Sequence, residues 1–223
     1  MALPKLQIAL DNGVLSEALT SISQVGDEVD VIEAGTILCL AEGMEAVRCL
    51  RALYPEKTIL ADTKCADAGG TVAKNCADAG ADWMTVICCA TIPTMQAALK
   101  EVQDLQVELY GDWTFELAAE WKQAGLTQVV YHQSRDALLA GETWGEKDLA
   151  KIRRLVEMGF KVSVTGGLEV ETLPLFAGID VFTFIAGRRI RDAADPRQAA
   201  RKFKAEIARI WGGDANGEPS WNL

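Results

Sequence analysis

The sequence is poor in the residues that build metal centres from nitrogen and sulfur. Histidine occurs once in 223 residues, as His132, and none of the six cysteines stands in a Cys-x-x-Cys pair. Because structural zinc sites take four such ligands at short, regular spacings, the sequence disfavours a zinc protein. The cysteine spacing also argues against a disulfide framework, so we expect reduced thiols in a cytoplasmic protein.

Long apolar runs and an excess of positive charge are missing as well. No stretch approaches the ~18 uninterrupted apolar residues of a membrane span, so we expect no transmembrane segment and no membrane partner. Residues 1–5 lead directly into a strand-like segment, and we therefore expect no signal peptide. The formal net charge of −10 argues against a nucleic-acid partner, but it leaves room for an anionic small molecule at a locally positive site.

The common nucleotide-binding loops are absent too. The first strand-like run ends in Asp11-Asn12-Gly13 instead of a Gly-x-Gly-x-x-Gly turn, and no Walker-type loop occurs. These absences weaken the alternative of an open, doubly wound sheet.

The sequence does contain a regular alternation of short apolar, β-branched runs with amphipathic, helix-like stretches. Eight strand–helix units of about 20–30 residues each predict a single α/β domain, a (β/α)₈ TIM barrel over residues 1–211. Residues 212–223 are polar and rich in glycine, and we expect a flexible tail there. One predicted helix is Glu42–Tyr54, and the last is Pro196–Trp211, capped by Asp195. The predicted strands are Leu6–Leu10, Val29–Ile32, Thr58–Ala61, Trp83–Ile87, Gln106–Leu109, Gln128–Tyr131, Lys161–Val164 and Val181–Ala186.

Charged and polar residues, and glycines, follow seven of the predicted strands. In a (β/α)₈ barrel the carboxyl ends of the strands meet at one mouth, where active sites of this fold are built. Seven independent strand ends of this kind would be an odd way to build a merely solvated surface, so we predict one active site at the mouth. The candidates are Asp11, Glu33, Asp62, Lys64, Glu108, His132, Arg135, Thr165, Gly167, Gly187 and Arg188.

The central stretch of the chain is residues 62–67, Asp-Thr-Lys-Cys-Ala-Asp. Strand alternation predicts that Asp62 and Lys64 point the same way, with Asp67 one turn further on. A lysine between two carboxylates stays protonated because opposite charge nearby favours its charged form. Taken alone, the pattern also fits a solvated surface ion pair.

Glu33 and Asp62 stand at neighbouring strand ends. Their hard oxygen atoms suit Mg²⁺, which takes one or two carboxylates from a protein and keeps several waters. The alternative is that one of the two is only the counter-ion of Lys64.

The ends of the last two predicted strands suit a phosphate. Glycines there let backbone N–H groups approach phosphate oxygens, and the Arg188 guanidinium can add a forked donor. The supporting residues are Thr165, Gly167 and Gly187, and a plain turn is the alternative.

His132 and Arg135 form a third zone. At a strand end beside carboxylates, the imidazole can shuttle protons or donate a hydrogen bond. A packed, hydrogen-bonded histidine is the alternative. Glu108 can orient substrate hydroxyls or Lys64, or it can be an ordinary paired carboxylate.

These motifs resemble the orotidine 5′-monophosphate decarboxylase superfamily, whose signature is Asp-x-Lys-x-x-Asp after the third barrel strand. Nearly the whole chain, up to Trp211, resembles the branch of sugar-phosphate decarboxylases that act on 3-keto-L-gulonate 6-phosphate. The matching segments are residues 6–11, 32–36, 60–64, 66–69, 131–136, 165–167 and 185–188.

The resemblance implies Mg²⁺-dependent decarboxylation of 3-keto-L-gulonate 6-phosphate to L-xylulose 5-phosphate and CO₂ through an enediolate, in L-ascorbate utilisation. Glu33 and Asp62 would hold the metal, and Lys64 would donate to the developing oxyanion. His132 and Arg135 would take part in proton delivery. The substrate and its phosphate would contact Asp11, Thr165, Gly167, Gly187 and Arg188. The resemblance also implies a homodimer in which Asp67 of each chain reaches into the partner's site.

Two other members of the superfamily are alternatives. Orotidine decarboxylases need no metal and carry a lysine where this chain has Glu33, which disfavours that activity. Hexulose-6-phosphate synthase, a Mg²⁺-dependent aldolase, shares Glu33 and His132 but typically has aspartate where Glu108 stands and lacks Arg135. Glu108 and Arg135 therefore favour the decarboxylase over the synthase.

Two interpretations outside the superfamily also stay open. A pentulose-phosphate epimerase would need two opposed acid/base residues, whereas this mouth places a lysine between carboxylates. A non-catalytic sugar-phosphate binding protein would leave the full set of charged strand ends unexplained.

Overall fold

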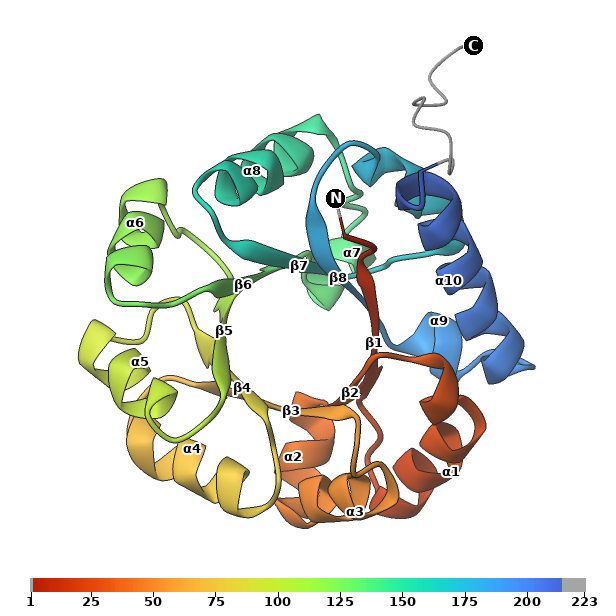
Figure 1. Ribbon diagram of the computed structural model, residues 1–223, viewed down its shortest axis with the longest axis horizontal. Coiled ribbons are helices and arrows are strands. Elements are labelled where there is room, and N and C mark those ends of the chain that lie inside the picture. Colours follow the sequence, from red (N-terminus) through yellow and green to blue (C-terminus); the bar gives the residue numbers. More distant parts are fainter. Residues whose placement is uncertain (1, 214–223) are drawn as a thin grey trace.

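Eight parallel strands close into a barrel in the computed structural model, which describes residues 2–213 (Figure 1). The strands pair in chain order, and the eighth returns to pair with the first, so the predicted (β/α)₈ barrel is confirmed. Part of the predicted tail, residues 214–223, lies outside the described residues. The strands are β1 (Lys5–Leu10), β2 (Val31–Ala34), β3 (Thr58–Cys65), β4 (Trp83–Ile87), β5 (Asp104–Leu109), β6 (Gln128–His132), β7 (Lys161–Thr165) and β8 (Val181–Ala186).

Helices surround the barrel on all sides (Figure 1). The last helix has the predicted bounds, and the Asp195 side chain caps it by accepting the Gln198 N–H at 2.9 Å. The α-helices are α1 (Leu15–Val25), α2 (Thr36–Glu42), α3 (Glu45–Leu53), α4 (Gly69–Asp78), α5 (Ile92–Leu99), α6 (Phe115–Gln123), α7 (Arg135–Leu139), α8 (Glu146–Glu157), α9 (Arg188–Arg191) and α10 (Pro196–Trp211). Two 3₁₀ segments are η1 (Gly26–Glu28) and η2 (Val170–Phe176).

The segment after β2 differs from the prediction. The predicted helix Glu42–Tyr54 is present as α3, which begins three residues later than predicted, and the preceding helix α2 was not predicted. Gly43 has a φ of +61°, a conformation that ends α2 and that L-residues rarely adopt. The predicted start at Glu42 belongs to the end of α2, so the prediction was wrong only in extending the helix back across Gly43.

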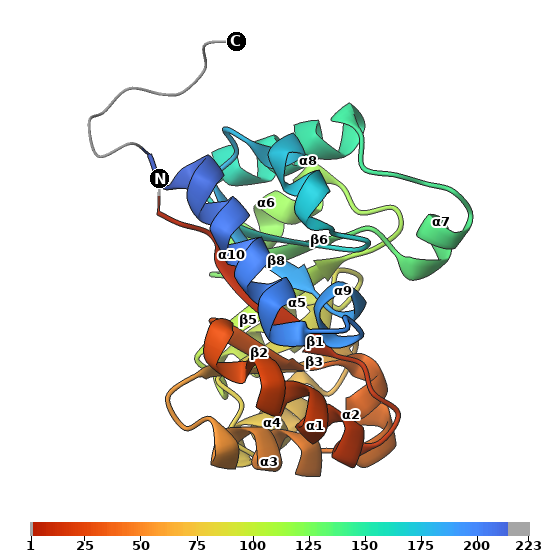
Figure 2. The ribbon, with the colours of Figure 1, turned by 90° about the vertical axis from the view of Figure 1, so that its right-hand side faces the viewer.

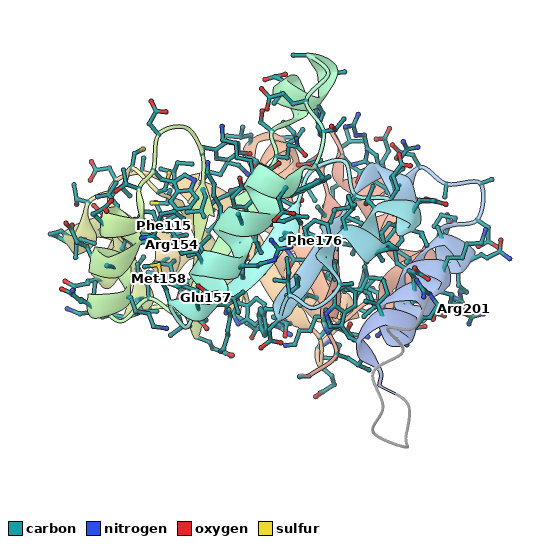
Figure 3. The ribbon with its side chains drawn as sticks, turned by 90° about the horizontal axis from the view of Figure 1, so that it is seen from above. Phe115, Arg154, Glu157, Met158, Phe176 and Arg201 are labelled. Atoms are coloured by element: carbon teal, nitrogen blue, oxygen red, sulfur yellow. The ribbon has the colours of Figure 1, made fainter. Side chains whose placement is uncertain are left out.

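An apolar layer between the helices and the strands holds the structure together. The helices bury one face against the outside of the strands, as α10 does with Phe203, Ile207 and Trp211. Neighbouring helices also contact each other: the Arg154 guanidinium of α8 lies 3.9 Å from the ring centroid of Phe115 on α6 (Figure 3). Within residues 2–213 no helix combines the length and apolarity that a membrane crossing requires.

The segment between β6 and α8 stands apart from this packing. Helix α7 projects from the side of the barrel at which β6 ends, and α9 lies on that same side (Figure 2). The loops that follow the strands therefore gather at one mouth, where the predicted site residues should meet.

Candidate active site

A cavity of about 430 Å³ opens at the carboxyl ends of the strands. This volume is in the range of small-ligand pockets. Of the twelve residues that the sequence analysis assigns to the site, only Asp67 is missing from its lining, and Asp67 is exposed. The barrel brings the others together from seven strands: Asp11, Glu33, Asp62, Lys64, Glu108, His132, Arg135, Thr165, Gly167, Gly187 and Arg188.

Strand β3 departs from regular geometry where it delivers Lys64. Ala61 pairs with Met84 of β4, and the next pair along is Cys65 with Val86. Lys64 has a φ of +44°, in the left-handed region that non-glycine residues seldom adopt. Strain of this kind gathers at functional sites, where surrounding contacts hold it in place.

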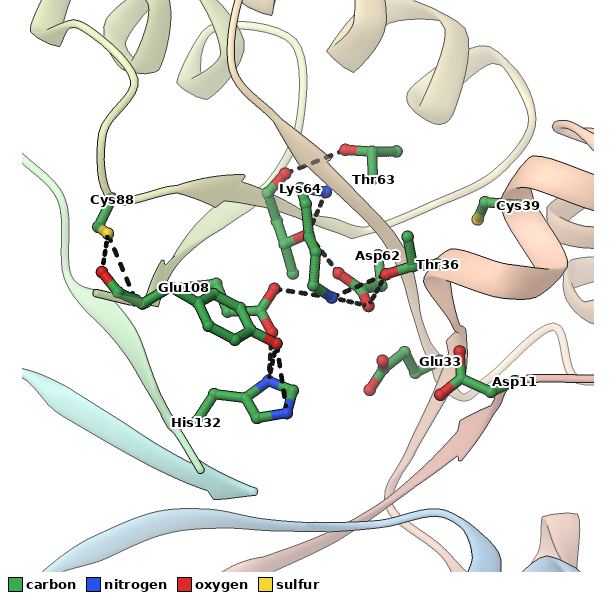
Figure 4. A network of polar contacts seen from close by, with 12 residues as sticks. Asp11, Glu33, Thr36, Cys39, Asp62, Thr63, Lys64, Cys88, Glu108 and His132 are labelled. Atoms are coloured by element: carbon green, nitrogen blue, oxygen red, sulfur yellow. Dashed lines mark hydrogen bonds and ion pairs between the residues drawn. The ribbon is translucent and has the colours of Figure 1, made fainter. Parts of the chain in front are cut away.

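Lys64 lies between two carboxylates, as predicted, but the second carboxylate within the chain is Glu108 and not Asp67 (Figure 4). Its Nζ is 2.6 Å from Asp62 Oδ2 and 3.0 Å from Glu108 Oε2, the latter an ion pair without hydrogen-bond alignment. Burial alone would lower the pKa of Lys64, but the charges of Asp62 and Glu108 outweigh it and hold this pKa above its usual value. Both carboxylates are buried, so the surface ion-pair interpretation is wrong.

Asp62 is held by a complete set of donors. Its Oδ1 accepts from the Thr85 hydroxyl at 2.7 Å, and its Oδ2 accepts from Thr36 at 2.6 Å and from Lys64. Burial would raise the pKa of Asp62, but the charge and hydrogen bonds of Lys64 and the two hydroxyls lower it below its usual value. Asp62 is therefore an ionised acceptor fixed in one orientation.

Glu33 lies in a contrasting environment beside Asp11 (Figure 4). Burial raises its pKa well above the usual value, and the charges of Asp62 and Asp11 raise it further. Its Oε2 accepts one hydrogen bond from Gln7 at 2.5 Å, and the ion pairs found within residues 2–213 do not include Glu33. A carboxylate crowded by like charge, without its own cation, suits a position next to a bound cation.

The carboxylates of Glu33 and Asp62 suit Mg²⁺ better than a metal whose ligands all come from the protein. Within the described chain, no three His, Cys, Asp or Glu side chains gather as a metal-binding group. A cation beside Glu33 and Asp62 would thus take two protein carboxylates and complete its shell from water or substrate, as Mg²⁺ does.

Glu108 connects the lysine to the histidine. Its Oε1 is 2.6 Å from His132 Nδ1, and Tyr110 Oη lies 2.7 Å from the same nitrogen. The Glu108 carboxylate, which is paired with Lys64, can only accept a hydrogen bond. We therefore assign the proton of the neutral ring to Nδ1, so that Nε2 carries the lone pair. His132 lines the cavity, so it is not a packed core histidine. Of the two contacts predicted for Glu108, the one with Lys64 is present.

Arg135 begins α7 at the rim of the cavity. Its Nη2 is 3.6 Å from Asp11 Oδ2. This ion pair connects the residue that follows β1 with the helix that follows β6. Arg135 is about half exposed, which leaves its guanidinium free to turn toward a ligand.

The ends of β7 and β8 form a positive, glycine-lined side of the cavity. Gly166 has a φ of +104°, and a Cβ there would lie 2.0 Å from the Gln133 carbonyl oxygen, so only glycine fits. The Gly166 carbonyl in turn accepts from Trp144 Nε1 at 2.8 Å. Arg188 and Arg191 line the same side, so the residues predicted to bind phosphate lie together.

Several polar residues that line the cavity were missed in the sequence, among them Thr36, Thr85, Tyr110 and Arg191. Thr36 and Tyr110 follow strand ends already assigned to the site, so proximity could have identified them. Thr85 lies on β4, the one strand for which the sequence predicts no site residue. A polar side chain in the apolar run 83–87 was the available signal.

Comparison with known proteins places this geometry in a family. Residues 4–203 match the model of the orotidine 5′-phosphate decarboxylase / HUMPS family. The chain is 57% identical over 216 residues to 3-keto-L-gulonate-6-phosphate decarboxylase UlaD of Escherichia coli O17:K52:H18 (strain UMN026 / ExPEC), covering 95% of this chain and 100% of that relative.

Solved structures are similar over the same extent. A ligand complex of KGPDC from Streptococcus mutans has a TM-score of 0.94 at 64% identity, covering 95% of this chain and 100% of that chain. 3-Hexulose-6-phosphate synthase from Salmonella typhimurium has a TM-score of 0.85 at 30% identity, covering 92% of this chain and 99% of that chain. With its barrel, its Asp62–Lys64 pair and these matches, the chain belongs to the orotidine 5′-phosphate decarboxylase / HUMPS family.

Proposed function

We propose that this chain is a carboxy-lyase that converts 3-keto-L-gulonate 6-phosphate to L-xylulose 5-phosphate and CO₂. The observation that carries the proposal is the cavity in which Lys64 is fixed between Asp62 and Glu108, in a chain 57% identical over 216 residues to a decarboxylase of that substrate. The same reaction places the chain in L-ascorbate utilisation.

Lys64 supplies the electrostatic part of the reaction. Loss of CO₂ from a β-keto acid leaves an enediolate, whose negative charge needs a donor already in position. The Lys64 ammonium has three N–H donors. Two go to Asp62 at 2.6 Å and Thr36 at 2.7 Å, and the third is left for the substrate, because the ion pair with Glu108 at 3.0 Å has no hydrogen-bond alignment. Because these partners hold it protonated and oriented, little rearrangement is needed as the charge develops.

His132 and Arg135 take part in delivering the proton that completes the product. The Glu108 carboxylate fixes His132 through Nδ1, so Nε2, which lies 3.3 Å from Tyr110 Oη, is the ring atom available to move a proton, directly or through water. Arg135, at the rim above Asp11, is placed to orient the substrate or that water.

The substrate phosphate binds at the glycine-lined side of the cavity. The backbone at Gly167 and Gly187 can approach its oxygen atoms closely, and Arg188 and Arg191 offset its charge. Asp11 lies on the adjoining strand end, where it contacts the sugar hydroxyls.

Glu33 and Asp62 are the residues that would hold Mg²⁺. When bound, the ion supplies Lewis-acid stabilisation of negative charge on the substrate. The crowding of Glu33 by Asp62 and Asp11 supports this assignment, since a divalent cation would offset their repulsion.

We further propose that the chain acts as a homodimer with shared active sites. Asp67 is exposed and lies outside its own cavity, which fits a role in a partner's site. Exposed apolar side chains near the mouth support an interface there: Ile37 is 44% exposed, Leu40 80% and Leu139 78%. A cytoplasmic location is consistent with the six free thiols of the described chain.

Two parallel assays test the activity. The purified chain with Mg²⁺ is given 3-keto-L-gulonate 6-phosphate, and CO₂ release is measured. A second reaction measures formation of hexulose phosphate from formaldehyde and a pentulose phosphate. The proposal expects release of CO₂ as the main activity. Aldol formation without CO₂ release would instead establish hexulose-6-phosphate synthase, the alternative supported by the 30% identical structure.

A further inference from the structure

The irregular part of β3 stands opposite a single residue of β4. Ala61 pairs with Met84 and Cys65 with Val86, so the three residues Asp62, Thr63 and Lys64 face Thr85 alone. A bulge of this size leaves backbone groups without ladder partners, and they need other partners when they are buried.

Thr85 supplies a contact to each residue of this bulge. Its hydroxyl donates to Asp62 Oδ1 at 2.7 Å and accepts from the Lys64 N–H at 2.9 Å. Its carbonyl oxygen accepts from the Thr63 hydroxyl at 3.0 Å. The Thr85 side chain is buried, with 3% of the residue exposed, so water does not compete freely for these bonds.

We propose that Thr85 is a positioning residue, which holds the β3 bulge so that Asp62 and Lys64 keep their working geometry. The proposal rests on the proposed function. One hydroxyl joins the backbone of Lys64 to the side chain of Asp62. The hydrogen bond that it donates and the one that it accepts strengthen each other. The left-handed backbone of Lys64 depends on such outside contacts, because local sterics oppose it.

The bulge also explains how Lys64 reaches both carboxylates. From this position Lys64 Nζ contacts Asp62 two residues earlier and Glu108 on β5, which lies beyond β4. A regular strand would keep the β3–β4 ladder intact and leave the Thr85 hydroxyl without its backbone donor. Loss of the Thr85 hydroxyl should therefore disturb the donor that stabilises the enediolate more than it disturbs substrate binding.

The test compares three variants of the full chain. Thr85→Val keeps the shape and removes the hydroxyl, whereas Thr85→Ser keeps the hydroxyl. Thr183→Val is the matched control, because Thr183 is also a buried strand threonine but its hydroxyl has no hydrogen-bond partner within residues 2–213. Thr85→Ala replaces Thr85→Val if thermal unfolding shows that the valine variant is not folded.

We expect Thr85→Val to lower kcat by about 10–100-fold while KM changes less than about threefold. Hydrogen exchange of the Lys64 amide, followed by NMR, should become at least about tenfold faster because its acceptor is gone. Thr85→Ser should restore both properties, and Thr183→Val should leave both unchanged.

Three results would overturn the role of Thr85: an unchanged kcat in Thr85→Val, a serine variant as impaired as the valine one, or unchanged protection of the Lys64 amide. If the unmodified chain releases no CO₂, the proposed function fails. The exchange of the Lys64 amide still decides whether Thr85 holds the bulge, so the two failures are distinguishable.

Discussion

Two buried carboxylates of the same cavity have pKa values that are shifted in opposite directions. Asp62 has a pKa below its usual value because Lys64 and two hydroxyls donate to it, whereas burial and like charge raise the pKa of Glu33. The difference comes from partners and not from depth, since 5% of Asp62 and 7% of Glu33 are exposed. Asp62 is thus held in its charged form, whereas the charge of Glu33 is offset by no neighbouring cation in an ion pair within residues 2–213.

Glu33→Gln tests this contrast. The amide removes a charge repelled by Asp62 and Asp11, so without added metal the variant should melt higher, by about 2–4 °C. With Mg²⁺, CO₂ release should fall by about 10–100-fold or more, because a cation ligand is lost. Thermal unfolding, Mg²⁺ calorimetry and rate assays check this, with Glu28→Gln, which loses its ion pair to Arg201, as the control. Unchanged Mg²⁺ affinity would remove Glu33 from the ligands.

Tyr110→Phe tests how His132 is oriented. The phenol lies 2.7 Å from His132 Nδ1, and the two ring centroids are 4.8 Å apart, so the ring loses one of its two restraints in the variant. We expect kcat to fall by about tenfold with little change in KM. Steady-state kinetics decide, and Tyr54→Phe, which loses a hydrogen bond to the Ile22 carbonyl instead, should keep full activity. Equal losses in both variants would count against this role.

At the scale of single elements, the end of β7 is shaped by glycine. Gly166 and Gly178 both have positive φ, at +104° and +78°, but only Gly166 lies against a neighbouring backbone. The close approach of Gly166 to Gln133 joins the β7 end to the segment that leads into α7. The phosphate side of the cavity therefore depends on two loops packed together.

Gly166→Ala and Gly178→Ala separate the cost of a left-handed alanine from the cost of a backbone clash. Both variants carry the cost of a left-handed alanine, about 1–2 kcal/mol, but Gly166→Ala adds a clash with the Gln133 carbonyl. Its melting temperature should fall several degrees further than that of Gly178→Ala, and its KM should rise because the phosphate side is displaced. Calorimetry and steady-state kinetics measure both effects. Equal melting temperatures would contradict the close approach.

The sequence predicts the elements well where each carries its own signal. Strand runs with apolar, β-branched residues and the Asp195–Pro196 helix start were sufficient for the barrel and for α10. Helix α2 was not predicted, and the start of α3 was placed at Glu42, on the wrong side of Gly43, where α2 ends. Periodicity reports which side faces the core, but it does not report where the backbone turns.

The site could be predicted as a set but not in its contacts. Barrel closure alone brings the strand ends together, so eleven of the assigned residues line one cavity. The pairing of Lys64 with Glu108 depends on the bulge in β3, and the role of Thr85 depends on β4 pairing. Strand alternation predicts neither of these contacts, because both arise from the register between strands that are far apart in the sequence.

At the scale of the whole molecule, the cavity of one chain lacks one predicted group. The ion pairs found within residues 2–213 do not include Asp67, and this residue lies outside the pocket lining. Exposed leucines and isoleucine near the mouth offer an apolar surface of the kind that subunits bury. Together these features favour an assembly in which the mouth is completed by a second copy.

Mixing two inactive variants tests that assembly. Lys64→Ala and Asp67→Ala homodimers should each be nearly inactive, since every site lacks one group. In mixed dimers one of the two sites recovers both groups, so exchange of subunits should restore up to about a quarter of the unmodified activity, as in any symmetric dimer with random exchange. Sedimentation and mass spectrometry verify the exchange. No recovery despite verified mixed dimers would contradict shared sites.

The central claim is that Lys64, fixed by Asp62 and Glu108, stabilises the charge left when CO₂ departs. Its most direct test is CO₂ release from carboxyl-labelled 3-keto-L-gulonate 6-phosphate by the unmodified chain and by Lys64→Met, which keeps the length of the side chain and removes its charge. The variant should lose about 10²–10³-fold in kcat while it still binds L-xylulose 5-phosphate by calorimetry. A folded Lys64→Met variant that retains kcat within about threefold would contradict the claim.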